Sequence, residues 1–387
     1  MSMHPVLGHE GVRHALARAH RQGTLPSSLL LHGARGVGKQ HLALWLARLL
    51  VCERPGEGPC ETCAPCRMAS SLEHPDIHWY FPLERPKNAT GDRLVDALES
   101  ARHEELDDFR HKPLRPSWWD EVRAIYLGSV VNIRARAHKH PTMAEGPVFI
   151  VGQAESLVPQ EASQEAANAL LKLLEEPPGN VRFILTSSEP GLLLPTIRSR
   201  TVPLHVGPVG HDVVRGFLET HTGVDRKVAD WAATLAQGSP GRALAFLPDD
   251  GELGPLEALR RRAFELVMAA TSTQASAGYE VAISFPPAGA RRLIDLFSFT
   301  EEWLRDLGAV AAGADDQIFN RDALARLQKH VKAMQLSPVA IATSFAAVER
   351  ARELARGNVN PQLVVSGLLR DLRRALGARP VLAAMSS

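Results

Sequence analysis

The sequence predicts an N-terminal α/β domain built on a parallel sheet, followed by helical domains. Short apolar runs such as Val148–Val151 and Val181–Leu185 indicate buried strands, and helical stretches separate them. This alternation is the pattern of a parallel sheet covered by helices on both faces. Beyond about residue 255 the apolar residues follow helical spacing instead. Because 387 residues exceed what one hydrophobic core usually serves, we expect two or three domains.

The composition limits the classes of protein to which this chain can belong. With 45% hydrophobic and 22% charged residues it is typical of a soluble globular protein. No apolar run approaches the roughly 20 residues that a membrane helix needs, and the N-terminus lacks the regions of a secretion signal. We therefore expect no membrane span and a cytoplasmic location. The formal net charge of +1 predicts no strong solitary binding to nucleic acid, so any DNA contact is expected to be shared with partners.

The first strand, Leu29–His32, leads directly into the segment Gly33–Lys39, which matches the phosphate-loop pattern Gly-x4-Gly-Lys. In such a loop the glycines let backbone N–H groups approach phosphate oxygens at a helix N-terminus, and the lysine bridges the outer phosphates. A helical apolar stripe follows, as the motif requires. The residues expected to contact phosphate in this degenerate loop are Gly33, Gly36, Gly38, Lys39 and Gln40.

All four cysteines of the chain lie in one short segment, residues 52–66. They are separated by seven, two and two residues, with the turn formers Pro59 and Pro65 beside them. In a cytosolic chain such clustering indicates metal ligation before disulfides or free thiols, and four thiolates fit a closed tetrahedral zinc site. His74 and His78 follow the cluster and are not expected to compete for the ion. The predicted ligands of this structural zinc are Cys52, Cys60, Cys63 and Cys66.

A helix, a double proline, a strand and a Ser-Arg pair follow one another in the next part of the chain. The run Gln164–Glu176 has the three/four apolar spacing of one buried helical face, and Pro177–Pro178 cannot continue that helix. The strand Val181–Leu185 and then Ser199–Arg200 come after it. This order resembles the ATPase module of the bacterial DNA polymerase III clamp-loader family, except that Thr201 replaces the cysteine of the family's Ser-Arg-Cys motif. Each of these features on its own would favour the simpler interpretation, an ordinary helix of an α/β domain and a surface arginine.

The groups that would handle magnesium and water are missing. Gln40 stands where the phosphate loop uses Ser or Thr as a magnesium ligand. Active ATPases of this family have Asp-Glu where this chain has Gly152–Gln153, and Glu155 lies too far along to replace them. Because phosphoryl transfer depends on positioned charge, we expect no ATPase activity of the chain's own, while ATP or ADP binding stays open. Ser187 and Arg242 stand at the family's two sensor positions and are expected to be structural.

The resemblance also implies how the chain divides into domains. It implies a RecA-like AAA+ domain with a parallel sheet, a small helical lid domain and an all-helical collar domain for oligomerisation. Asn358–Leu363 is similar to the entry of the last collar helix. The expected bounds are 1–207 for the AAA+ domain, with the zinc module at 52–66 and an insertion at about 84–145, then 208–250 for the lid and 255–387 for the collar.

The polar stretch Glu84–Glu145 is longer than the link that the family usually has at this place. It contains the pair Trp118–Trp119, which can anchor it to the domain. Extra surface helices are the favoured interpretation of this insertion, and a mobile excursion is the alternative.

Intact phosphate-loop glycines, missing magnesium ligands, a retained Ser-Arg pair and a zinc segment are together most similar to the catalytically silent stator of this family. The resemblance implies that Ser199 and Arg200 act in trans, with Arg200 as an arginine finger in the ATP site of an adjacent motor subunit. It implies a hetero-pentamer of DNA polymerase III with gamma/tau and delta subunits as partners. The sliding clamp and primed DNA would be reached through that complex.

Two other functions are weighed against the stator. A working gamma/tau-type motor would need an acidic pair at Gly152–Gln153, which this chain lacks. A zinc-bearing nucleic-acid-binding protein with a vestigial nucleotide fold would need a basic, aromatic-rich face, and the near-neutral charge does not favour it.

Overall fold

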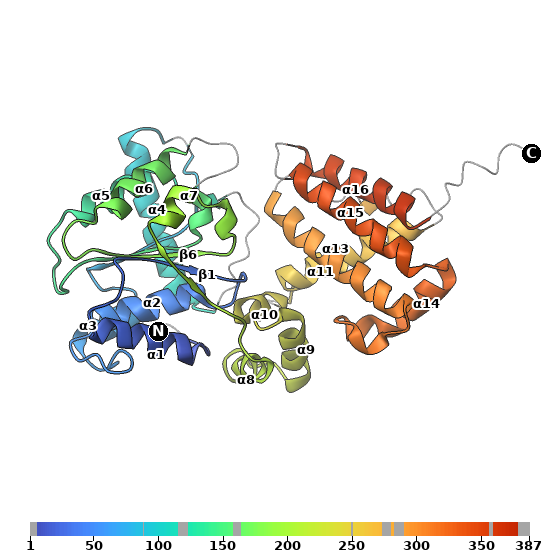
Figure 1. The fold of residues 1–387 in the computed structure, drawn as a ribbon, viewed down its shortest axis with the longest axis horizontal. Helices are drawn as coiled ribbons and strands as arrows, with labels where there is room; N and C mark the ends of the chain where they lie inside the picture. The colour runs from blue at the N-terminus through green and yellow to red at the C-terminus, as the bar shows by residue number, and fades with distance from the viewer. Residues whose placement is uncertain are drawn as a thin grey trace, which may run out of the picture. The chain divides into compact units, whose positions relative to one another are not determined.

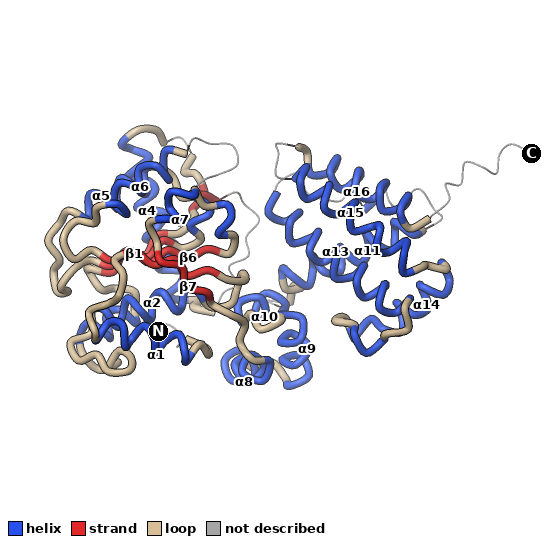
Figure 2. The backbone as a smooth tube through the Cα atoms, viewed as in Figure 1, coloured by secondary structure: helices blue, strands red, loops and turns tan. Residues whose placement is uncertain are grey.

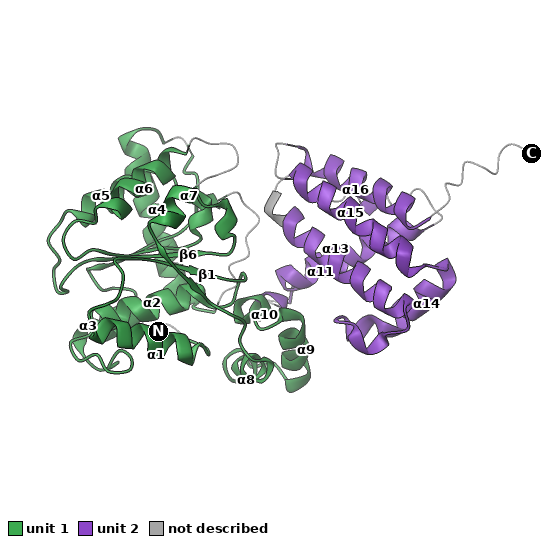
Figure 3. Ribbon diagram, in the orientation of Figure 1, with its two compact units in different colours: residues 1–117, 123–244 green, residues 118–122, 245–387 purple. Residues whose placement is uncertain are grey.

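The computed structural model describes residues 6–87, 89–114, 123–157, 164–248, 251–272, 280–281, 290–355 and 359–377. The chain divides into two compact units, with a boundary after Leu244 (Figure 3). We describe each unit by itself. The pair Trp118–Trp119 lies outside the described residues.

The first unit is built on a five-stranded sheet, whose strands are among those drawn red in Figure 2. The strand order is β2-β5-β6-β1-β7, and every neighbouring pair of strands is parallel. The two strands expected on either side of the double-proline helix are both in it, at the centre of the sheet. Parallel neighbours need crossover connections, and helices supply them here. The strands are β1 (Ser28–His32), β2 (Ile77–Tyr80), β5 (Val148–Val151), β6 (Arg182–Ser187) and β7 (Val202–His205).

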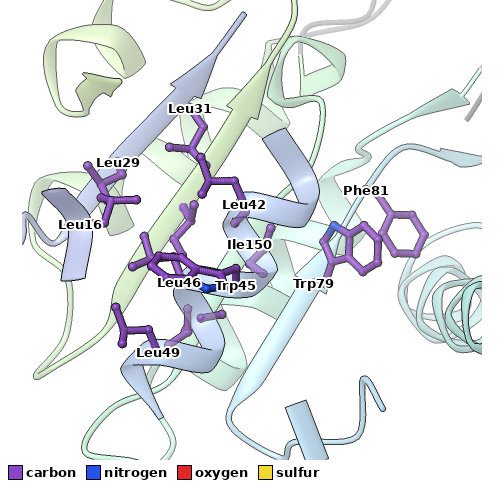
Figure 4. Packing of buried hydrophobic residues seen from close by; sticks show 14 of the residues in the cluster. Leu16, Leu29, Leu31, Leu42, Trp45, Leu46, Leu49, Trp79, Phe81 and Ile150 are labelled. Carbon is purple, nitrogen blue, oxygen red and sulfur yellow. The ribbon is translucent and has the colours of Figure 1, made fainter. Parts of the chain in front are cut away.

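Helices cover both faces of this sheet (Figure 1). Successive side chains of a strand point to opposite faces, so the apolar strands β1 and β5 contribute to two separate cores. Leu31 and Ile150 pack in the core that contains α1 (Glu10–Arg21) and α2 (Lys39–Leu50). Leu30 packs in the other core, with α6 (Glu165–Glu175). Figure 4 shows part of the first core, with Leu16, Leu29, Leu31, Leu42, Trp45, Leu46, Leu49 and Ile150 among the labelled residues.

The stretch expected to be an insertion contains regular structure. Two short strands, β3 (Leu83–Glu84) and β4 (Arg123–Ala124), pair in an antiparallel manner. The helix α4 (Asp92–His111) buries Leu98 and Leu106 in the same core as α2, so it belongs to the body of the unit. The helix α5 (Leu127–Ala137) also lies in this stretch.

Other short helices of the first unit lie outside this stretch. They are α3 (Ala64–Ser70) and α7 (Pro195–Ser199), with short 3-10 turns at Ala154–Leu157 and Pro190–Leu192.

Three helices follow the sheet. The Asp225 side chain caps the second of them by accepting hydrogen bonds from the Lys227 and Val228 backbone N–H groups. They are α8 (His211–Thr222), α9 (Arg226–Ala236) and α10 (Pro240–Phe246).

The second unit is helical throughout its described residues. The helical spacing expected beyond about residue 255 is confirmed, and Asn360 caps the last helix through the Gln362 N–H group. A polar network lies within it, where the buried Arg260 guanidinium contacts Glu257, Asn320 and Asp322. The helices are α11 (Pro255–Thr271), α13 (Ala290–Ala311), α14 (Leu324–Met334), α15 (Pro338–Ala355) and α16 (Pro361–Ala375), with 3-10 turns at Asp315–Gln317 and Arg321–Ala323.

Among the described residues, no single helix has the length and apolar character to cross a membrane. Only the bent pair Arg321–Met334 and Pro338–Ala355 passes such a test when its two parts are taken together.

Candidate functional site

The phosphate loop lies between β1 and α2, where the sequence places it. Its glycines are needed for backbone reasons. A Cβ atom on Gly33 would lie 2.2 Å from the Val206 carbonyl oxygen, and Gly38 has a φ of 106° at the N-cap of α2. Only glycine meets both requirements without strain, so these two positions of the loop depend on glycine.

Lys39 is buried, and its ammonium group is satisfied within the chain. Nζ donates hydrogen bonds to the carbonyl oxygens of Gly33 (2.9 Å) and Ala34 (2.8 Å) and to Oγ of Ser188 (3.0 Å). Burial lowers the pKa of Lys39 to about 8, although the carboxylate of Glu155 acts in the opposite direction. The three N–H donors of the ammonium therefore all have acceptors in this structure.

The structure brings Glu155 to this lysine, which sequence reasoning did not expect. Glu155 is buried in the 3-10 turn after β5, and its Oε1 accepts a hydrogen bond from the Ser188 backbone N–H group at 3.2 Å. Ser188 thus joins the lysine to the carboxylate. Ser188 was missed because the neighbouring Ser187 stands at the sensor position. Ser187 is fully buried, and its Oγ accepts a hydrogen bond from the Glu189 N–H group.

Gln40 and Gly152, which stand where active ATPases of this family have magnesium ligands, pack against each other. A Cβ atom on Gly152 would lie 3.2 Å from Nε2 of Gln40 and 3.2 Å from Nε1 of Trp79. The uncharged amide of Gln40 and the indole of Trp79 therefore occupy the space beside Gly152. A carboxylate at residue 152 would need both neighbours to move.

The helix α10 contacts the phosphate loop directly. The Gly241 N–H group donates a hydrogen bond to the Gly36 carbonyl oxygen at 2.9 Å, and a Cβ atom on Gly241 would lie 3.1 Å from the Gly36 Cα atom. Arg242, the second expected sensor, follows this contact and is half-buried. The segment after the sheet thus closes over the loop on one side.

The four cysteines form a cluster, as their spacing predicts. Their sulfur atoms all lie within 4.8 Å of one another, which fits four ligands of one metal ion. Two backbone N–H groups donate to these sulfurs, from Cys60 to Cys52 Sγ (3.2 Å) and from Cys63 to Cys60 Sγ (3.4 Å). Neither histidine that follows belongs to the cluster, because His74 accepts a hydrogen bond from the Asp76 N–H group and His78 packs on Phe149. An all-thiolate set of this kind suits zinc.

Arg200 lies at the C-terminal end of α7 with its side chain 34% exposed. Its Nη1 donates hydrogen bonds to the Thr196 carbonyl oxygen (3.1 Å) and to Ser199 Oγ (3.3 Å). Its Nη2 lies 2.6 Å from Oε1 of Glu175, the last residue of α6. The next residue, Thr201, is buried and donates its hydroxyl hydrogen to the Ile197 carbonyl oxygen. The Ser-Arg pair and the end of the double-proline helix are therefore in contact.

The five-stranded parallel sheet, its strand order and the phosphate loop after β1 define an α/β protein of the RecA-like AAA+ class. Within that class the chain belongs to the family described as "DNA polymerase III, delta subunit", whose model matches residues 8–210. The delta-prime type of clamp-loader subunit, to which the motifs are most similar, is thereby confirmed.

Curated relatives agree with this family. The delta-prime subunit of Escherichia coli K12 is 28% identical over 236 residues, which are 61% of this chain and 58% of that protein. The delta-prime subunit of Pseudomonas aeruginosa is 35% identical over 175 residues, 45% of this chain and 40% of that protein. A gamma/tau subunit of Mycobacterium bovis is 32% identical over 197 residues, 51% of this chain and 27% of that protein. The chain thus spans less than two thirds of the length of these relatives.

Proposed function

We propose that this chain is a stator of the DNA polymerase III clamp loader. In this proposal it supplies Arg200 as an arginine finger to the ATP site of a neighbouring motor subunit, while the ring loads the sliding clamp onto primed DNA. The observation that carries the proposal is a contrast between two places on the chain. Its own nucleotide site lacks the charges for hydrolysis, whereas Arg200 presents a guanidinium at the surface. Arginine fingers raise turnover by about 10³- to 10⁵-fold, so a silent subunit can be indispensable.

The chain's own phosphate loop supports the silent role. Gln40 and Gly152 offer no charge for magnesium, and the Lys39 ammonium already has three acceptors. A nucleotide phosphate would have to displace those acceptors before it gained the lysine. We infer that the glycines and Lys39 now maintain the shape of the loop and that binding of ATP or ADP is at most passive.

The cysteine cluster is proposed to hold one structural zinc ion. Four converging thiolates leave no open position for water, so such an ion would stabilise the segment between α2 and α3 and take no part in chemistry. The ligands would be Cys52, Cys60, Cys63 and Cys66.

The assembly is proposed to be a hetero-pentamer in the cytoplasm, with gamma/tau and delta subunits as partners. The helices of the second unit would form its collar, and α8 to α10 would form the lid. The division into AAA+ domain, lid and collar remains the proposed one. A gamma/tau-type motor is the alternative, because gamma/tau proteins are among the relatives. The uncharged Gly152–Gln153 pair speaks against it.

The test is a clamp loader reconstituted from all subunits of the organism. Arg200→Ala is expected to leave the subunit folded and the ring assembled, yet to lower the ATPase and clamp-loading rates strongly on primed DNA. The exposed Arg198, on the same short helix, offers a matched control, and Arg198→Ala is expected to keep wild-type rates. Wild-type rates from an intact ring that carries Arg200→Ala would overturn the finger.

A further inference from the structure

Among the residues that the structure describes, Glu175 is the charged group that forms an ion pair with Arg200. The guanidinium is held from two sides. Thr196 and Ser199 contact Nη1 from within α7, and Glu175 contacts Nη2 from the end of α6. A guanidinium has five N–H donors, and the two hydrogen bonds to Thr196 and Ser199 use two of them. Donors therefore remain for an acceptor that comes from outside the chain.

The position of Glu175 is fixed by the end of its helix. Pro177–Pro178 cannot continue α6, so Glu175 is its last helical residue. A negative charge at a helix C-terminus is unfavourable for the helix dipole. The contact with Arg200 gives this carboxylate a positively charged partner at that position.

The exposure of the pair limits what it contributes to folding. The side chain of Glu175 is 44% exposed and that of Arg200 is 34% exposed. Ion pairs with this much contact with water contribute little to stability. Such a pair can still fix the orientation of a long side chain, and a free arginine loses much rotamer freedom when it is fixed. A carboxylate that fixes it beforehand removes that loss from the step in which the arginine acts.

We propose that Glu175 is a positioning residue that holds the Arg200 guanidinium in place for the neighbouring ATP site. This proposal rests on the proposed arginine finger. It gives the first glutamate of the Leu-Glu-Glu-Pro-Pro segment a role in the turnover of the ring, exerted through Arg200 and without contact with nucleotide. The second glutamate, Glu176, is exposed and lies outside the helix, so it is the matched control within the same segment.

The experiment uses the complete reconstituted loader with primed DNA and clamp. Glu175→Ala is expected to lower kcat for ATP roughly three- to tenfold, with KM for ATP unchanged, because only the orientation of the finger is lost. Glu175→Gln keeps an oxygen that can accept a hydrogen bond, so it is expected to retain a larger part of the rate. Glu176→Ala is expected to match the wild type. In an Arg200→Ala background, Glu175→Ala is expected to cause no further loss.

The outcomes separate the two proposals. A wild-type or higher kcat for Glu175→Ala, together with a strong loss for Arg200→Ala, would overturn the positioning role and leave the finger intact. An equal loss for Glu176→Ala, or a loss that appears only in KM, would also overturn it. Wild-type rates for Arg200→Ala would overturn the finger itself and the positioning role with it. Thermal unfolding and the subunit composition of each ring show that every variant is folded and assembled.

Discussion

Lys39 shows at the level of single residues how surroundings decide what a side chain does. The motif predicts a phosphate ligand, yet its ammonium donates hydrogen bonds to Gly33, Ala34 and Ser188. The gain from a bound phosphate is the difference between the new contacts and these three, so it is smaller than in a loop whose lysine is free. Glu155 contributes through Ser188, and the carboxylate lowers the cost of a buried ammonium. The same residue type can thus be a ligand in one subunit and a structural donor in another.

His78 gives a pH dependence that can be measured. Burial, together with the positive charges of Arg136 and Arg102, lowers the pKa of His78 to about 4. As the pH falls from 6.5 to about 4, the unfolded chain binds a proton that the folded chain does not, so stability falls in that window. The loss due to this residue is at most about 3 kcal/mol. His78→Phe, next to Phe149, should flatten the dependence in denaturant unfolding measured across that window.

A suitable control for the pH measurement is the exposed His138, and His138→Asn is expected to keep the wild-type slope. If the stability of His78→Phe fell between these pH values by as much as that of the wild type, burial of His78 would not be the cause.

At the level of elements, the segment between α2 and α3 has no apolar core of its own. Its buried cluster consists of the cysteines alone. Without a metal, the four thiols offer little to offset the conformational entropy of ordering the segment. The end of α6, which Pro177–Pro178 terminate, is a second such element, because it places Glu175 in contact with Arg200 at the end of α7. In both cases a local feature of the sequence creates the geometry of a contact.

We expect one zinc ion per chain in protein purified without added metal. Removal of the ion with a strong chelator should release four titratable thiols and lower the unfolding temperature of the first unit, because the ligands would then lose their common partner. Metal analysis with thiol titration and calorimetry measures both effects. Cys63→Ser should behave like the chelated protein, while Thr62→Ala, in the same loop, should not. A metal content near zero with four free thiols would show that the cluster binds no ion.

At the scale of the whole molecule, the two units carry different features. The first unit carries the phosphate loop without magnesium ligands and Arg200, and the second unit is helical with its own buried network around Arg260. In the proposed function, activity is a property of the assembled ring. The proposal would explain how a chain without magnesium ligands retains the shape of an ATPase.

The isolated chain is accordingly expected to show no ATP hydrolysis above background, even with DNA and clamp present. The missing charges at Gln40, Gly152 and Gln153 are the reason, since phosphoryl transfer depends on them. Steady-state phosphate release measures the rate, and Lys39→Ala is the control for contaminating enzymes. Hydrolysis that disappears in Lys39→Ala would contradict the prediction, whereas binding without hydrolysis agrees with it.

The class of fold, the phosphate loop, the cysteine set and the family could all be predicted from the sequence. Each depends on residues that are close together in the chain, such as the apolar run Val148–Val151 or the spacing of the cysteines. Local backbone preferences and side-chain periods are enough to predict such features.

The contacts between distant parts of the chain could be found only in the folded structure. It placed Glu175 on Arg200, Ser188 and Glu155 on Lys39, and Gln40 in the space beside Gly152. The partners in these contacts come from different strands, helices and loops, and no local period or motif relates them. Their distances follow from how the parallel sheet aligns the ends of its strands and how the helices pack on it, which is a property of the folded chain as a whole.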